Sequence, residues 1–357
     1  MADHDEEEPP SPSSSGDPES YPLTQATAGV FFALASASLF AMSSLLSSRR
    51  RARASSGGGV GEGRLPVRDP TWWTSGGAAV SAELMQFAAL AHSPLTLVAP
   101  LASSSSIVLA ALAAHALRQD SLNMFGALGC VLWAAGCLPL ILTVPEEPLV
   151  RAFSDVWLQT QEPGFVAYVG TVMLALVVLV CFAVPAHGSG SPFACAAISG
   201  LLGSISIMAA KVLAIGVRLA LAGDTRSVQP VVCLLPLACL ACYLLQQNYN
   251  LRAGSAQRSG LATPLNFVVF NATALGGYML MFRVPLVVQE VGTELCSLVT
   301  MAAGVLLIYC TRTLDTSNVS GLLRVGPKPT REDQLDSAAA AEKGRNKGPP
   351  PRQPLFG

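Results

Sequence analysis

Charged residues are scarce in this chain. Asp, Glu, Lys and Arg make up 13% of its 357 residues, whereas soluble domains carry about 25%. Hydrophobic residues reach 51%, and the mean hydropathy is +0.47. A composition this poor in charge excludes an ordinary cytosolic enzyme, a nucleic-acid binder and a disordered scaffold. It predicts a multi-pass membrane protein that contacts the lipid bilayer and no nucleic acid.

The sequence also lacks the motifs of common enzymes. It contains no Walker loop, no G-x-S-x-G, no H-E-x-x-H and no dinucleotide fingerprint, so we expect neither an enzyme nor a bound cofactor. No basic stretch precedes a cleavable apolar segment at the N-terminus, so we expect no signal peptide. The nine cysteines all fall in apolar runs, which predicts reduced and buried thiols.

Apolar runs of spanning length follow one another along the chain. The hydrocarbon core of a bilayer needs about 20 apolar residues in a helix, and turn residues separate the runs. The fold class predicted is therefore an all-α membrane protein with about nine transmembrane helices. The expected spans are residues 26–46, 72–91, 95–116, 124–144, 165–184, 194–219, 230–251, 261–282 and 288–310.

The two ends of the chain differ from this apolar part. Residues 1–25 hold seven acidic residues and no Lys or Arg, and residues 313–357 mix charges with Gly and Pro. We expect both to be disordered tails flanking a transmembrane domain over residues 26–312. The Arg-rich and then Gly-rich segment 47–70 is expected to be a flexible loop.

The distribution of basic residues predicts the orientation. With nine spans and the N-terminus outside, 17 of the 22 Lys and Arg residues fall in the inner loops and the C-terminal tail. Basic residues are enriched on the cytosolic side of membrane proteins. The N-terminus should therefore lie outside or in a lumen, and the C-terminus in the cytosol.

An internal repeat appears at a shift of 164 residues. Under this shift Pro100 falls on Pro264, Glu83 on Gln247 and Gln86 on Asn250. The matching spans are five apart, an odd number, so the two copies would cross the membrane in opposite directions. Inverted repeats of this kind are typical of secondary transporters, whose sites lie near the midplane between the repeats. The alternative is that these short matches arise by chance, because apolar helices are built from few residue types.

Glu83 is the first candidate for a functional residue. It lies eleven residues after Trp72, an expected interfacial anchor, which places it about 16 Å deep. A carboxylate there can bind a hard divalent cation or a proton, or act as a structural hydrogen-bonding group. The polar end of the seventh span offers neutral oxygen ligands beside it: Gln247, Asn248 and Asn250.

Other polar residues and prolines within the spans are further candidates for a transport pathway. Lys211 is expected to snorkel to the interface, with pairing to Glu83 as the alternative. Glu294 and Glu290 form an acidic i, i+4 pair that we expect to be exposed at the interface, with cation attraction as the alternative. The remaining candidates are the two prolines, which should kink the third and eighth spans and free carbonyl groups, and nearby amides: Pro100, Pro264, Gln86, Asn266 and Asn271.

Together these pieces resemble the NIPA-type magnesium transporter family of the drug/metabolite transporter superfamily. The resemblance covers about residues 26–312. It is carried, in order, by Trp72-Trp73, Ala82-Glu83 with Gln86-Phe87, Pro94 to Leu101, Glu162 to Phe165, His187-Gly188, Ser204 to Lys211, Gln247 to Ala253, Thr263 to Leu265 and Gly292-Thr293.

The resemblance implies a drug/metabolite-transporter-like bundle with an inverted repeat, and transport of Mg²⁺ at the plasma membrane and endosomes. Glu83 would then be the charged ligand, and Mg²⁺ would move down its electrochemical gradient. The chain departs from the family pattern at Ala82, Gln86, Ala102-Ser103, Asn266-Phe267, Phe282 to Val284 and Glu294. Two alternatives therefore remain: an organic-solute carrier of the same superfamily, or a non-transporting membrane adaptor that retains the fold. No oligomeric state is predicted.

Overall fold

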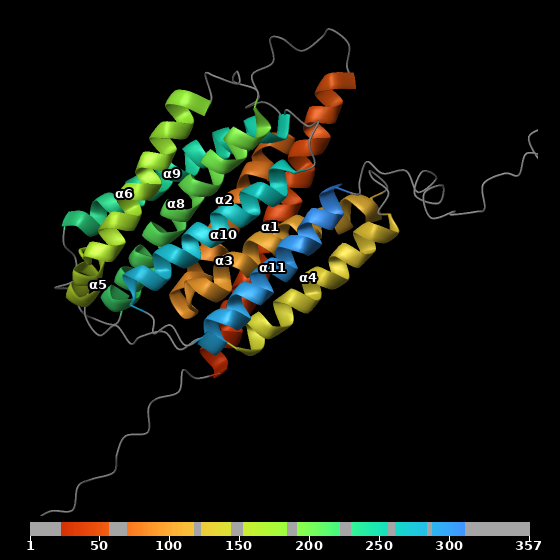
Figure 1. Ribbon diagram of the computed structural model, residues 1–357. Coiled ribbons are helices and arrows are strands. Elements are labelled where there is room, and N and C mark those ends of the chain that lie inside the picture. The colour runs from red at the N-terminus through yellow and green to blue at the C-terminus, as the bar shows by residue number, and fades with distance from the viewer. Residues whose placement is uncertain are drawn as a thin grey trace, which may run out of the picture. The chain divides into compact units, whose positions relative to one another are not determined.

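Helices make up nearly all of the chain that the structure describes. This computed structural model describes residues 23–56, 70–117, 123–143, 153–183, 191–221, 230–255, 261–283 and 288–310, and no strand occurs among them (Figure 1). The prediction of an all-α protein is confirmed. The tails predicted to be disordered lie almost wholly outside these residues.

Nine of the helices have 16 residues or more within this described part. Each corresponds to one of the nine expected spans, and their bounds are α1 (Leu23–Ser56), α2 (Pro70–His92), α3 (Leu95–Ala116), α4 (Met124–Leu142), α6 (Pro163–Val178), α8 (Pro192–Leu221), α9 (Pro230–Ser255), α10 (Ala262–Met281) and α11 (Val288–Cys310). A short helix, α5 (Phe153–Thr160), precedes α6, and one π-helical turn, η2 (Leu179–Ala183), follows it.

Seven of the long helices are apolar enough to cross a membrane. Helices α2 and α9, with 23 and 26 residues, are long enough to cross a membrane but are not among these seven. These are the helices that carry Glu83 and the amide-rich segment around Gln247. Polar side chains in the described part therefore reduce the hydropathy of the two helices on which the sequence places its candidate site.

Prolines set many of the helix boundaries. Pro70, Pro163, Pro192 and Pro230 are each the first residue of a helix, a position where the missing N–H would be unpaired in any case. Pro94 separates α2 from α3 because a proline disfavours helical geometry in the residue before it. The helix starts that proline predicts from the sequence are therefore close to the helix starts in the structure.

The first helix is longer than expected. It continues through the Arg-rich segment to Ser56, so the expected loop cannot begin at residue 47. Arginine is a good helix former, and no Gly or Pro interrupts the chain before Gly57. The remainder of the expected loop, residues 57–69, lies outside the described residues.

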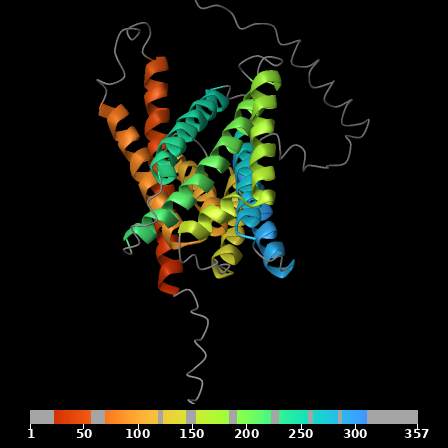
Figure 2. The ribbon, with the colours of Figure 1, turned by 90° about the vertical axis from the view of Figure 1, so that its left-hand side faces the viewer.

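Two groups of three helices pack in the same way. Helix α1 packs against α2 and α3, and α8 packs against α9 and α10. Helix α3 contacts α10, which joins the groups, while α4 packs along α11 (Figure 1). Figure 2 shows α1 and α2 on one side of the bundle and α6 on the other, with α8 crossing between them. The helices α3, α4, α10 and α11 therefore meet where the two groups join.

Glycine allows α4 and α11 to approach closely. A Cβ atom added at Gly304 would lie 2.6 Å from the Gly129 carbonyl oxygen and 2.8 Å from the Trp133 nitrogen. Both neighbours belong to the backbone and cannot swing away, so the helices themselves would have to separate. Contact between helix backbones through small residues is a common packing mode in membranes.

We expect Gly304→Ala to destabilise the protein by about 1–3 kcal/mol, the usual cost of overpacking a dense core. The measurement is the melting temperature of the purified protein in detergent. Gly77→Ala is the matched control on another helix, because a Cβ atom at Gly77 meets no atom within 4 Å. Equal melting temperatures for the two variants would contradict the packing described for α4 and α11.

Candidate functional site

The structure brings Glu83 and Gln247 into one cluster. The Glu83 side chain on α2 forms a hydrogen bond with Tyr243 on α9, and Tyr243 forms another with Gln247. Tyr243 and Gln247 are four residues apart, so they share one face of α9. The cluster therefore holds a carboxylate from α2 and a phenolic hydroxyl and an amide from α9.

Tyr243 is absent from the candidates that the sequence provides. Tyr243 lies one helical turn before Gln247. This spacing could have added Tyr243 to the candidates, because both residues lie on the same face of α9. A phenol is weakly polar and fits an apolar span, so composition alone does not single it out. The contact with Glu83 depends on the tertiary placement of two residues that lie about 160 positions apart in the chain.

The other predicted ligands are not placed in this cluster. Asn248 and Asn250 have exposed side chains, and no contact described in the structure joins either one to Glu83. Asn248 is rotated by about 100° around α9 from Gln247, because an α-helix has 3.6 residues per turn. Gln86 is half-buried on α2. Their roles as ligands stay predictions.

Lys211 does not snorkel, and the expectation that it does is wrong. It is 1% exposed on α8, and its Nζ atom donates hydrogen bonds to the carbonyl oxygens of Leu90 at 2.8 Å and Ser93 at 3.0 Å. The regular helical partner of the Leu90 carbonyl would be the N–H of residue 94, which is Pro94 and has none. Lys211 therefore provides the donor that the proline removes at the α2–α3 corner.

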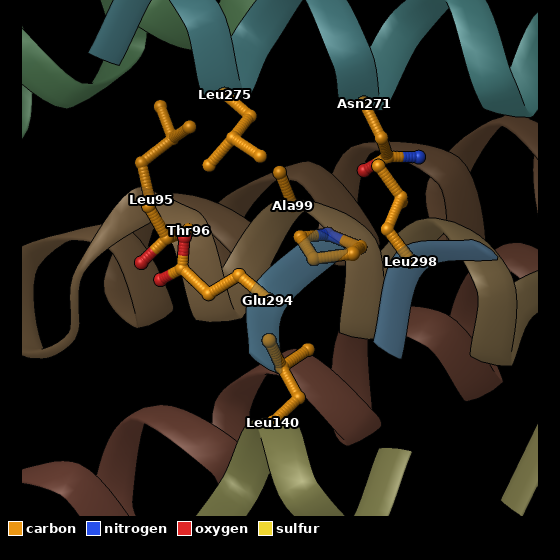
Figure 3. A pocket seen from close by; sticks show the side chains of 9 residues that line it. Leu95, Thr96, Ala99, Leu140, Asn271, Leu275, Glu294 and Leu298 are labelled. Atoms are coloured by element: carbon orange, nitrogen blue, oxygen red, sulfur yellow. The ribbon is translucent and has the colours of Figure 1, made fainter. Parts of the chain in front are cut away.

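Glu294 is buried in a pocket where four helices meet, so the expected exposed acidic pair is wrong. Glu294 is 6% exposed. Figure 3 shows its carboxyl group turned toward Thr96. The side chain of Glu290 lies outside what the structure describes. The pocket is lined from α3, α4, α10 and α11 by Leu95, Thr96, Ala99, Pro100, Leu140, Asn271, Leu275, Glu294 and Leu298.

The two prolines matched by the repeat have different effects. Pro100 lies inside α3 and lacks the N–H that would bond the Thr96 carbonyl four residues earlier. Pro264 is the third residue of α10, where no backbone N–H has a partner within the helix. Pro264 therefore frees no carbonyl group, and the expectation that it does is wrong.

The amides on α10 are buried or half-buried near this pocket. Asn271 is 2% exposed, and its Nδ2 atom donates to the Phe267 carbonyl at 2.8 Å and to the Ser103 hydroxyl at 3.1 Å. The Oδ1 atom of Asn266 is buried without a hydrogen-bond partner among the described residues. Asn271 thus belongs to the pocket lining, whereas Asn266 does not.

No compact cluster of ionisable ligands occurs in the described part of the chain. Nowhere in it do three or more His, Cys, Asp or Glu side chains lie together. A cation bound within these helices would therefore need neutral oxygen atoms beside a single carboxylate. The Glu83 cluster and the Glu294 pocket each offer that combination.

Several apolar helices and buried polar groups of this kind define a multi-pass integral membrane protein. The model of the magnesium transporter NIPA family matches residues 24–314. The chain belongs to this family, which confirms the resemblance given by the sequence. Because the family is one of membrane transporters, the expectation that the chain is not an enzyme is confirmed as well.

The chain is similar to curated members of the family over most of its length. It is 30% identical to the probable magnesium transporter NIPA3 of Arabidopsis thaliana over 311 residues, which cover 85% of this chain and 84% of the relative. It is 29% identical to the probable magnesium transporter NIPA1 of the same plant over 294 residues, covering 81% and 87%. With the magnesium transporter NIPA4 of Mus musculus the identity is 26% over 257 residues, covering 71% and 63%. No solved structure matches the chain significantly.

Proposed function

We propose that this protein transports Mg²⁺ across a membrane and that Glu83 is the charged ligand on the path. The observation that carries the proposal is the Glu83–Tyr243–Gln247 cluster, which is contributed by α2 and α9. A carboxylate within a span is costly and is retained for function by default. Membership of the family and the names of its curated members support Mg²⁺ as the substrate.

The chemistry of the cluster suits a hydrated magnesium ion. Mg²⁺ dehydrates reluctantly, so it is usually held by one or two carboxylates while it keeps several waters. Glu83 supplies one negative charge, and the Gln247 amide and the Tyr243 hydroxyl supply oxygen atoms for the ion or its waters. No ATP site is needed, because the negative interior potential favours entry of a divalent cation.

We infer that the fold is an inverted repeat with nine spans. The packing of α1 against α2 and α3 has its counterpart in the packing of α8 against α9 and α10. A shift of 164 residues maps α2, α3 and α4 onto α9, α10 and α11 within a few residues. The count of basic residues supports a lumenal or outer N-terminus and a cytosolic C-terminus, and the family resemblance favours the plasma membrane and endosomes.

Mg²⁺ uptake into proteoliposomes, followed with a fluorescent indicator, tests the function and the site together. We expect uptake by the wild-type protein and loss of nearly all of it in Glu83→Gln, which keeps the size of the side chain and removes the negative charge. Glu162→Gln is the matched control. Glu162 pairs with the exposed Arg283 at the start of α6, and surface pairs of this kind contribute little.

Each outcome of this assay has a clear meaning. Normal uptake by Glu83→Gln would remove Glu83 from the path. Absence of uptake by both proteins, with both correctly inserted, would favour the organic-solute carrier or the adaptor. A carrier would then bind a metabolite, whereas an adaptor would lose its function when its tails are deleted and not when Glu83 is replaced.

A further inference from the structure

The Glu294 pocket combines a confined volume with apolar walls. It has room for about one particle the size of a water molecule. Five of its nine lining residues are Leu or Ala, and a sixth is Pro100. These walls cannot hydrogen-bond to water, so the pocket has no place for an ion that keeps a hydration shell.

Oxygen atoms of three residues nevertheless converge on this volume. Thr96 is 5% exposed, and its hydroxyl has no hydrogen-bond partner in the described part of the chain. Its carbonyl group also lacks the helical donor that Pro100 cannot provide. The Glu294 carboxylate adds a negative charge from α11, and it faces Thr96 across the pocket (Figure 3).

Asn271 presents its oxygen atom and not its nitrogen to the pocket. Its Nδ2 atom is engaged by the Phe267 carbonyl and the Ser103 hydroxyl. The Ser103 hydroxyl donates to the Ala99 carbonyl at 2.6 Å and lies at a longer 3.4 Å from Asn271 Oδ1, so this amide oxygen keeps a lone pair for a further ligand. Figure 3 shows this oxygen on the side of the pocket and the nitrogen turned away.

We propose that this pocket binds one dehydrated Na⁺ ion. The ligands are the Glu294 carboxylate, the hydroxyl and carbonyl oxygens of Thr96, and the amide oxygen of Asn271. Backbone carbonyls released at an interrupted helix coordinate Na⁺ or H⁺ in secondary transporters. The site is separate from the Glu83 cluster, and the proposal does not depend on Glu83.

The small volume and the nearby positive charge favour Na⁺ over Mg²⁺ in this pocket. Mg²⁺ would have to lose nearly all of its water, which it does reluctantly. The ammonium group of Lys211 ends at Ser93, three residues before Thr96, and this nearby positive charge further disfavours a divalent ion. A proton on Glu294 would make the stability of the protein depend on pH without any dependence on Na⁺, and the experiment below separates these two cases.

The test is direct binding of ²²Na⁺ to the purified full-length protein in detergent, with its melting temperature measured in parallel. Choline chloride replaces NaCl at constant pH and ionic strength. We expect saturable binding of one Na⁺ per chain and a melting temperature that rises with Na⁺ because the ion binds only the folded state. Glu294→Gln should abolish both effects, and Thr96→Val should weaken binding by about tenfold.

The Thr96→Val variant keeps the test decisive if Glu294→Gln fails to fold, because valine has nearly the same shape and removes only a hydroxyl that has no described partner. Glu162→Gln is the control and should bind Na⁺ as the wild type does. Three results would overturn the proposal. The first is unchanged Na⁺ binding in both pocket variants, and the second is a Glu294-dependent rise in melting temperature with Mg²⁺ instead of Na⁺. The third is a melting temperature that changes with pH and does not change with Na⁺. None of these readouts involves Mg²⁺ uptake, so failure here is distinguishable from failure of the transport function.

Discussion

Replacing Lys211 by Met is expected to destabilise the protein strongly. Methionine fills a similar volume, so the packing of α8 is kept while the ammonium group is removed. The carbonyls of Leu90 and Ser93 would then be buried without donors. An unsatisfied buried acceptor costs about 1–3 kcal/mol, which gives a loss of about 2–5 kcal/mol for the pair.

The measurement is the melting temperature in detergent, together with the amount of folded protein that can be purified. Arg218→Met is the matched control on the same helix. Its Nη1 atom contacts the Ala91 carbonyl at a longer 3.4 Å and is only partly buried, so we expect a small effect. If the two variants were equally stable, Lys211 would not hold the α2–α3 corner.

A membrane potential is expected to change Mg²⁺ accumulation by orders of magnitude. Moving one elementary charge across 100 mV releases about 2.3 kcal/mol, so a divalent ion gains about 4.6 kcal/mol. This energy corresponds to an equilibrium concentration ratio of roughly 10³ or more. Proteoliposomes with an interior potential of about −100 mV should therefore accumulate Mg²⁺ well above the outside concentration, and depolarised ones should stop at equality.

The potential can be set with a K⁺ gradient and valinomycin, with the same Na⁺ concentration on both sides. Proteoliposomes containing Glu83→Gln are the control for leakage. Accumulation that does not respond to the sign of the potential would mean that Mg²⁺ exchanges for other charge. Mg²⁺ transport would still be supported by this result, but the membrane potential would not be its driving force.

The sequence was a good guide to the helices because the signals for them are local. Apolar runs of spanning length and prolines at their starts depend only on neighbouring residues, and every expected span has a corresponding helix. The end of α1 differs from the sequence prediction, because a run of arginines suggests a loop although no residue in it breaks a helix. Pro264 was misjudged for a related reason: its effect depends on its distance from the first residue of α10, which is a boundary difficult to fix from sequence.

The sequence also identified part of the Glu83 cluster. The repeat placed Glu83 over Gln247, and the structure connects these two residues through Tyr243. It did not separate Gln247 from Asn248 and Asn250, because composition does not reveal which face of α9 is turned toward α2. The role of each of these residues in binding Mg²⁺ stays a prediction for the uptake assay.

By itself, the sequence determined that this protein is an all-helical, multi-pass membrane protein of the magnesium transporter NIPA family, and where its helices lie. Only the tertiary structure decided the surroundings of the buried charges. Lys211 and Glu294 looked suited to the interface because long charged side chains can reach water near the ends of spans. In the fold, partners from helices distant in the chain surround them: the Leu90 and Ser93 carbonyls for Lys211, and the Thr96 and Asn271 pocket for Glu294. Whether a polar group is paired depends on which helices pack together, and no local pattern in the chain encodes that.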